Sequence, residues 1–215
     1  QPYIDIATKD GAKITYVFET HFHADFVSGH IDLAKKTGAK IVFGPLAETK
    51  YEVLNAKDGE VFSIGKIKIK VLHTPGHTPE SSCYLLLDEK GKEHCLFTGD
   101  TLFIGDVGRP DLLDGKMTSA ELASMLYDSL NNKIKPLPDD VLVYPAHGAG
   151  SSCGKNISKE TWSTLGQQKK TNYALQDMSR ENFIKAVTDG LSAPPQYFFK
   201  DAMINKNGYD NIDEV

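Results

Sequence analysis

Several predicted strands of this chain end in side chains that can bind a metal ion, and this pattern limits the folds open to it. The side chains that follow four such strands are His21, His23, His77, Asp100 and His147. A turn containing Gly or Pro comes next in each case. Loops at one rim of a sheet are where binding sites usually assemble. The chain has only seven histidines, so we predict a metal site at one edge of a sheet scaffold.

The spacing of apolar residues predicts strands and helices along most of the chain. Strands are predicted at 14–19, 40–44, 66–74 and 140–148, with a two-stranded hairpin over 81–100. Helices are predicted at 25–38, at 117–134 and from about 158 onward, before an irregular tail from 191 to 215. Strands dominate the first two thirds of the chain and helices recur between them, which indicates a layered α/β or α+β domain.

Composition and charge exclude several classes of protein. The net charge is −5 with scattered basic residues, which argues against a nucleic-acid partner. No apolar run approaches the ~20 residues that span a bilayer. Three widely spaced cysteines make no disulfide framework, so we expect a reducing cytoplasm. We expect one domain over residues 1–200 and a linker-like segment over 201–215.

Four motifs carry a resemblance to a known family. The segments "THFHADF", "TPGHT", "TGDTLF" and "YPAHG" occur in the order and spacing of the metallo-β-lactamase superfamily. This resemblance implies an α+β fold, an αβ/βα sandwich with mixed sheets and the metal at one edge. That fold normally begins with two strands before the first metal motif. Only about twenty residues precede His21, so we expect those strands to be missing from this chain.

Within the superfamily, "HFHADFVSG" together with "FIGDVGRPD" resembles the persulfide dioxygenases, especially bacterial members that carry rhodanese domains after the dioxygenase domain. The implied activity is iron-dependent oxidation of a low-molecular-weight thiol persulfide by O₂ to sulfite and free thiol, as in sulfide detoxification. The expected partners are the persulfide and O₂, a downstream rhodanese domain and a second copy of the chain in a homo-oligomer.

The same resemblance nominates His21, His77 and Asp100 as ligands of one Fe(II) ion per chain. Two imidazoles and one carboxylate on one face, with the other face open, suit non-heme iron. The catalytic residues around that ion would be His23, Asp25 and His147. They would orient a bound water or a ligand imidazole by hydrogen bonds, and His147 could also carry a proton.

Phe26 is where this chain departs from the two-metal hydrolases of the superfamily, in which a histidine follows the aspartate of the motif. A phenyl ring cannot coordinate, so we predict one metal ion rather than two. The alternative is that Phe26 only packs at the start of the helix while Asp25 and His147 hold a weak second ion. A glyoxalase-II-like zinc thioester hydrolase would then be the leading alternative function. β-Lactam hydrolysis and a docking module with residual catalysis are more distant alternatives.

Two further residues are candidates for contact with the substrate. Arg109 could bind an acidic thiol carrier, because guanidinium matches a carboxylate in two-pronged fashion. It could equally brace its loop through Asp106 or Asp111. Cys153 could line the entrance and react with persulfide, or it could be an inert small residue.

Overall fold

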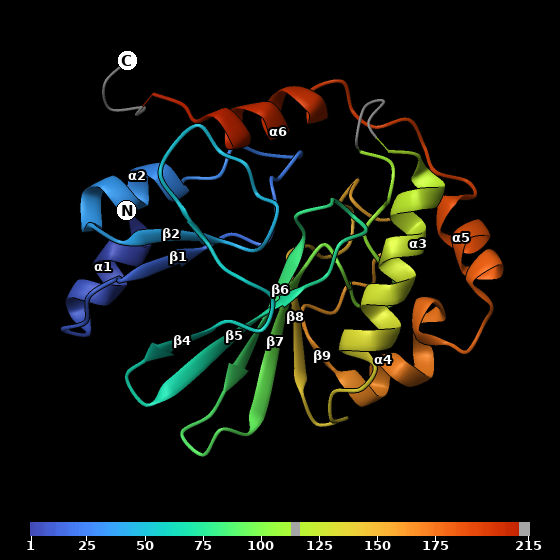
Figure 1. The fold of residues 1–215 in the computed structure, drawn as a ribbon, viewed down its shortest axis with the longest axis horizontal. Coiled ribbons are helices and arrows are strands. Elements are labelled where there is room, and N and C mark those ends of the chain that lie inside the picture. The colour runs from blue at the N-terminus through green and yellow to red at the C-terminus, as the bar shows by residue number, and fades with distance from the viewer. Residues whose placement is uncertain (113–116, 211–215) are drawn as a thin grey trace.

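The computed structural model describes residues 1–112 and 117–210 as two β-sheets with flanking helices (Figure 1). The strands are β1 (Tyr16–Phe18), β2 (Lys40–Phe43), β3 (Leu54–Asn55), β4 (Val61–Ile64), β5 (Ile67–His73), β6 (Ser82–Leu87), β7 (Glu93–Gly99), β8 (Leu142–Pro145) and β9 (Ser163–Thr164). The α-helices are α1 (Pro2–Lys9), α2 (His30–Thr37), α3 (Ser119–Ser129), α4 (Leu165–Thr171), α5 (Arg180–Thr188) and α6 (Phe198–Asn207). A π-helical turn, Leu130–Ile134, extends α3.

The larger sheet is mixed, as predicted. Strands β4 to β7 form an antiparallel meander, and β8 pairs with β7 in parallel. Strand β9 pairs with β8 antiparallel and forms the edge of the sheet. The smaller sheet holds β1, β2 and β3 in parallel. Alternation along β5 buries Ile69 and Val71 and leaves Lys68 exposed, which is the period-two pattern of a half-buried strand.

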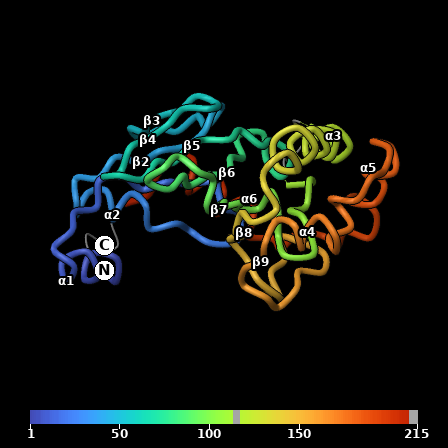
Figure 2. The backbone as a smooth tube through the Cα atoms, turned by 90° about the horizontal axis from the view of Figure 1, so that it is seen from below, coloured from blue at the N-terminus to red at the C-terminus, as the bar shows by residue number. Residues whose placement is uncertain are grey.

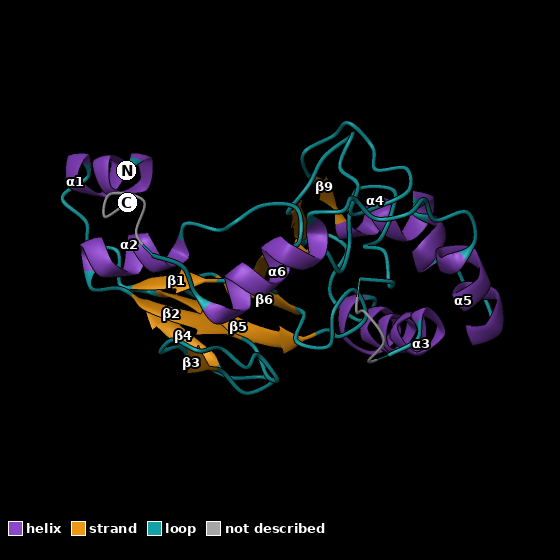
Figure 3. Cartoon of the chain, turned by 90° about the horizontal axis from the view of Figure 1, so that it is seen from above, coloured by secondary structure: helices purple, strands orange, loops and turns teal. Residues whose placement is uncertain are grey.

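Two apolar layers hold the architecture together. Between the sheets, Val42 of β2 packs with Val71 and Tyr84 of the larger sheet. On the opposite face of the larger sheet, buried residues of α3 and α5, among them Leu126 and Phe183, pack against the strands. Figures 2 and 3 show α3, α4 and α5 grouped at one end of the molecule, with the smaller sheet, α1 and α2 at the other.

The predicted helix over 25–38 is wrong at its start. Helix α2 begins at His30, and Val27, which the predicted helix includes, is 41% exposed. The backbone N–H of Ser28 donates to the side chain of Asn205, so a tertiary contact holds this segment as a loop. The predicted end is correct, because Gly38 adopts the left-handed conformation (φ 73°) that favours glycine.

The prediction of an irregular tail is also wrong, because residues 198–207 form α6. Phe198 is fully buried and Asn205 is 2% exposed, so both are part of the packed structure. Of the predicted linker-like segment 201–215, residues 211–215 lie outside the described residues. Among the residues that are described, no helix is both long and apolar enough to cross a membrane.

Candidate metal centre

Loops from both sheets deliver the predicted ligand residues to one place. His21 lies three residues after β1, in the smaller sheet. In the larger sheet His77 lies four residues after β5, Asp100 directly follows β7, and His147 lies two residues after β8. Each side chain is therefore fixed by the end of a strand, which is the placement that the sequence pattern predicted.

The first cluster contains His21, His77 and Asp100, which are each about 1% exposed. The two Nε2 atoms converge on one carboxylate oxygen: Asp100 Oδ2 lies 3.3 Å from Nε2 of His77 and 3.8 Å from Nε2 of His21. Neither oxygen of Asp100 has a hydrogen-bond partner among the described residues. A buried carboxylate without partners is costly unless a cation lies beside it, so the donor set fits a metal ion.

Hydrogen bonds on the far side of each imidazole turn it toward this cluster. Nδ1 of His77 donates to the carbonyl oxygen of Arg109 at 2.8 Å, which leaves the lone pair on Nε2. Nδ1 of His21 contacts Oγ1 of Thr20 at 2.9 Å. The loop after Asp100 approaches so closely that a Cβ at Gly108 would lie 2.0 Å from the Asp100 carbonyl oxygen. Only glycine fits there without a shift of the backbone.

The electrostatics prepare the first cluster for a divalent ion. Burial lowers the pKa of His21 well below its ordinary value, so the imidazole is neutral and can donate a lone pair. Burial alone would raise the pKa of Asp100, but His21, His77 and His147 outweigh it and hold that pKa far below its ordinary value. The cluster therefore presents a neutral imidazole and an ionised carboxylate, the state that metal ligands require.

The second cluster contains His23, Asp25 and His147, whose donor atoms lie within 4.8 Å of one another. Nε2 of His147 lies 3.3 Å from Oδ2 of Asp25 and 3.4 Å from Oδ1 of Asp100. Asp100 thus turns one oxygen to each cluster. Burial alone would lower the pKa of His147, but the two carboxylates outweigh it and raise the pKa.

Phe26 lies against this second cluster and does not pack in the core. Its ring is 43% exposed and faces the ring of His23, with centroids 4.5 Å apart and planes 31° apart. It lies four residues before the start of α2, outside the helix. The residue after Asp25 therefore contributes an apolar face beside an imidazole and no donor atom.

The predicted contact between Arg109 and substrate is not supported by its position. The residue is 3% exposed, and its guanidinium pairs with the Asp111 carboxylate through two bonds of 2.6 and 2.8 Å. It also donates to the carbonyl oxygens of Ser152 and Ser192. Arg109 braces its loop, the alternative stated above, and its own carbonyl fixes His77.

Cys153 does not line an entrance either. It is 1% exposed and packs in an apolar cluster with Phe103 and Phe198, although its sulfur lies within 4.8 Å of donor atoms of Asp100 and His147. Burial, reinforced by the charges of Asp100 and Asp25, raises the pKa of the thiol. A buried, protonated thiol is a poor nucleophile, so the alternative of an inert residue fits better.

Asn205 is the functional residue that the sequence analysis missed. Its side chain is buried and accepts from the N–H of Ser28 at 2.9 Å. Its amide group donates to the carbonyl oxygens of His23 at 2.7 Å and Phe26 at 2.8 Å. Helix α6 thereby holds the loop that carries His23, Asp25 and Phe26. No local pattern identifies such a residue, because all its partners lie about 180 positions away.

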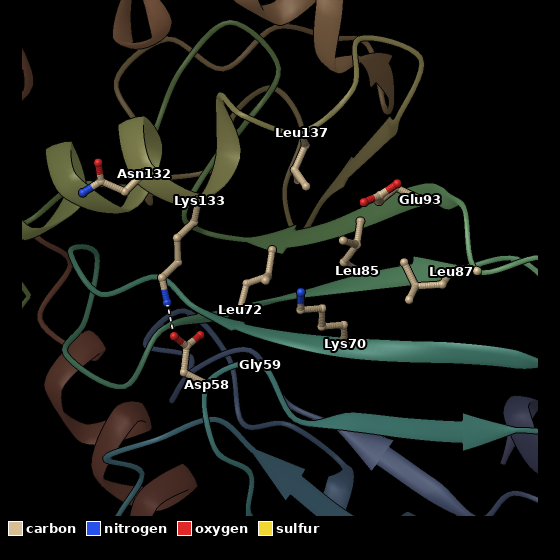
Figure 4. Close-up of a pocket in the computed structure, with 11 residues that line it drawn as sticks. Asp58, Gly59, Lys70, Leu72, Leu85, Leu87, Glu93, Asn132, Lys133 and Leu137 are labelled. Atoms are coloured by element: carbon tan, nitrogen blue, oxygen red, sulfur yellow. Dashed lines mark hydrogen bonds and ion pairs between the residues drawn. The ribbon is translucent and has the colours of Figure 1, made fainter.

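A separate cavity of about 340 Å³ lies against the larger sheet near the π-helical turn (Figure 4). Leu72 and Leu85 line it, and an ion pair of 2.5 Å between Lys133 and Asp58 lies at its side. None of the predicted site residues lines this cavity. Acidic and basic side chains are mixed around it, so it offers no single charge to a ligand, and we assign it no function.

Comparison with known proteins identifies relatives of two kinds. The family model described as the metallo-beta-lactamase superfamily matches residues 3–147. The human mitochondrial persulfide dioxygenase ETHE1 is 30% identical over 207 residues, which is 92% of this chain and 74% of that protein. A probable hydroxyacylglutathione hydrolase of Schizosaccharomyces pombe is 32% identical over 139 residues, 65% of this chain. The chain spans about half the length of the hydroxyacylglutathione hydrolases it matches first.

A solved structure of a metallo-beta-lactamase from Staphylococcus aureus subsp. aureus COL superposes with a TM-score of 0.90. The two sequences are 38% identical, and the match covers 97% of this chain and 64% of that one. This similarity confirms the predicted α+β sandwich with mixed sheets.

We predict that Asp100→Asn weakens metal binding by more than about 100-fold, because a neutral amide replaces the charged donor between the two imidazoles. Competition with a chelator for Zn²⁺ measures the change. Asp177→Asn, at an exposed carboxylate, is the control and should bind metal normally. Unchanged affinity in Asp100→Asn would contradict the ligand assignment.

We predict that Asn205→Asp lowers the free energy of unfolding by about 2–3 kcal/mol, because a carboxylate would face two carbonyl oxygens that now accept hydrogen bonds. Metal affinity should fall with it, by about 10-fold. Urea unfolding and chelator competition measure the two effects. The matched control, Asn182→Asp on an exposed position of α5, should stay within about 0.5 kcal/mol of the wild type.

Proposed function

The chain belongs to the metallo-beta-lactamase superfamily, and we propose that within it the protein is an iron-dependent persulfide dioxygenase. The proposed reaction converts a low-molecular-weight thiol persulfide, O₂ and water into the free thiol and sulfite. One Fe(II) ion per chain is the proposed cofactor. A reducing cytoplasm is the proposed setting, in keeping with three cysteines that are all free and buried.

The residue after Asp25 is the observation that carries this proposal. Phe26 has no donor atom, and its ring covers one face of His23. A second ion beside Asp25 would lack the ligand that the two-metal hydrolases of the superfamily place there. A centre with one well-formed ligand set suits oxygenase chemistry better than a bridged pair of zinc ions.

The extent of the similarity supports the same choice. The match to the human persulfide dioxygenase covers 92% of this chain, whereas the match to the Schizosaccharomyces pombe hydrolase covers 65%. Helix α6 and Asn205, which hold the metal loop, lie in the last tenth of the chain. The longer match therefore favours the persulfide dioxygenase over the hydrolase.

His21, His77 and Asp100 would hold the iron, since their donor atoms converge and the carboxylate has no other partner. Bound there, Fe(II) would supply the one-electron chemistry that activates O₂. The protein's own part is to place the groups around it. His23 Nδ1 and Asp25 Oδ1 are buried without partners and can orient a water molecule, while His147 Nε2 can hold a proton between two carboxylates.

The second candidate function is a zinc-dependent thioester hydrolase of the glyoxalase II kind. The second cluster favours it, because His23, Asp25 and His147 converge and Asp100 turns an oxygen to them. The first cluster and the second cluster would each hold one zinc ion, and bound zinc would lower the pKa of a water molecule to supply the hydroxide that such an enzyme uses. Metal content and oxygen consumption separate the two functions.

We predict that protein loaded anaerobically with Fe(II) binds about one ion per chain and consumes one O₂ per sulfite formed from a thiol persulfide. Oxygen uptake is measured with glutathione persulfide and coenzyme A persulfide, and sulfite is quantified as the product. The Asp100→Asn variant should consume none. Two zinc ions per chain, with hydrolysis of a glutathione thioester and no persulfide-dependent oxygen uptake, would establish the hydrolase instead.

We predict that Phe26→His raises the number of Zn²⁺ ions bound per chain from one toward two, because it adds a donor beside Asp25 and His147. Calorimetric titration of metal-free protein counts the sites. Phe26→Leu, which keeps apolar bulk without a donor, should still bind one ion. A single ion in Phe26→His would show that another feature limits the metal number.

A further inference from the structure

Glu19 carries a buried carboxylate that lies beside the second cluster and belongs to neither group of candidate ligands. It directly follows β1 and is 8% exposed. Its backbone is fixed on both sides, since its N–H donates to the Val42 carbonyl at 2.9 Å and its carbonyl accepts from the Tyr84 hydroxyl at 2.7 Å. The side chain is therefore aimed by rigid strands and not by a mobile loop.

The two carboxylate oxygens of Glu19 face different partners. Oε1 accepts a hydrogen bond from the Ser28 hydroxyl at 3.0 Å. Oε2 lies 3.7 Å from Nε2 of His23, and both side chains are about one-tenth exposed. On the other edge of the same imidazole, Nδ1 is buried and has no hydrogen-bond partner among the described residues.

The His23 ring is thus held from two directions. Glu19 faces one nitrogen, and the Phe26 ring covers one face at 4.5 Å between centroids. The backbone of His23 is fixed as well, because its carbonyl accepts from Asn205. The remaining free group is Nδ1. A ring nitrogen of His23 lies within 4.8 Å of donor atoms of Asp25 and His147, and because Nε2 faces Glu19, we take Nδ1 to be the nitrogen directed there.

A neutral imidazole carries its proton on one nitrogen and its lone pair on the other. The separation of 3.7 Å exceeds a hydrogen bond, so Glu19 acts on the ring by charge. A carboxylate attracts an N–H edge and repels a lone pair, which favours the proton on Nε2. We propose that Glu19 is a positioning residue that fixes His23 in the Nε2–H tautomer and so directs the Nδ1 lone pair into the metal centre.

This inference rests on the metal centre of the proposed function but not on its substrate or on the identity of its metal. The Nδ1 lone pair would serve the centre either as a further nitrogen donor or as the acceptor that orients a water molecule. Both roles fail if the proton sits on Nδ1. Carboxylates that orient metal-site histidines in this way commonly change metal affinity by 10–100-fold when removed.

The tautomer of His23 is read directly from ring nitrogen shifts in protein labelled with ¹⁵N-histidine and loaded with Zn²⁺. The signals of His23 are identified by their loss in His23→Gln. Spectra of the wild type and of every variant are recorded at one pH, so that their tautomers can be compared directly. The wild type should show a proton on Nε2 and none on Nδ1.

Three variants separate positioning from a merely structural role. Glu19→Leu removes the charge and should weaken Zn²⁺ binding by about 10-fold and mix the two tautomers. Glu19→Gln keeps the size of the side chain but not its charge, so it should also weaken Zn²⁺ binding and mix the two tautomers. Ser28→Ala removes the hydroxyl on the opposite oxygen and leaves the carboxylate facing His23, so its affinity should stay within about threefold of the wild type.

The Nδ1–H tautomer in the wild type overturns the inference; a protonated Glu19 that donates a hydrogen bond to the Nε2 lone pair would produce it. So does a Glu19→Leu variant that binds Zn²⁺ as tightly as the wild type with the tautomer unchanged. These readouts need neither iron nor persulfide. A negative oxygenase assay would therefore not contradict the role of Glu19. A negative tautomer result would not contradict the proposed oxygenase function.

Discussion

The buried charge of Asp100 is the constraint on which the rest of the site depends. The carboxylate is 1% exposed, lies at the end of β7 and has no hydrogen-bond donor among the described residues. Such a group destabilises a fold unless positive charge is supplied nearby. Imidazoles from the ends of β1, β5 and β8 surround it and favour its ionised form. The ends of these strands therefore place donor atoms around Asp100 that could bind a cation and balance the charge of its carboxylate.

The loops around Asp100 are fixed by contacts that span the chain. Arg109 ties the loop after β7 to Asp111 and to two backbone carbonyls, and its own carbonyl orients His77. Asn205 of α6, near the other end of the sequence, holds the loop after β1 through hydrogen bonds to its backbone. Each brace replaces hydrogen bonds that a loop backbone would otherwise make to water. The positions of the ligand residues therefore depend on Arg109 and Asn205, which hold the backbone of the loops and belong to neither cluster.

The difference between local and distant causes explains what the sequence could predict. His21, His77, Asp100 and His147 could be placed because each follows a strand with its own apolar period, and strand ends at one rim must meet. The start of α2 could not be placed, because Asn205 holds Ser28 outside the helix. From the sequence alone, Arg109 and Cys153 are both candidates for contact with the substrate. The structure shows that Arg109 is paired with Asp111 and that Cys153 is buried.

The second cluster explains how one metal ion can suffice in a site with two carboxylates. Asp25 and Asp100 both face Nε2 of His147, at 3.3 and 3.4 Å, and the pKa of that imidazole is raised. A proton on Nε2 places positive charge between the two carboxylates. Phe26 completes this arrangement, since it adds no donor and shields His23 from one side. One metal ion in the first cluster and one proton on His147 can then face the two carboxylates.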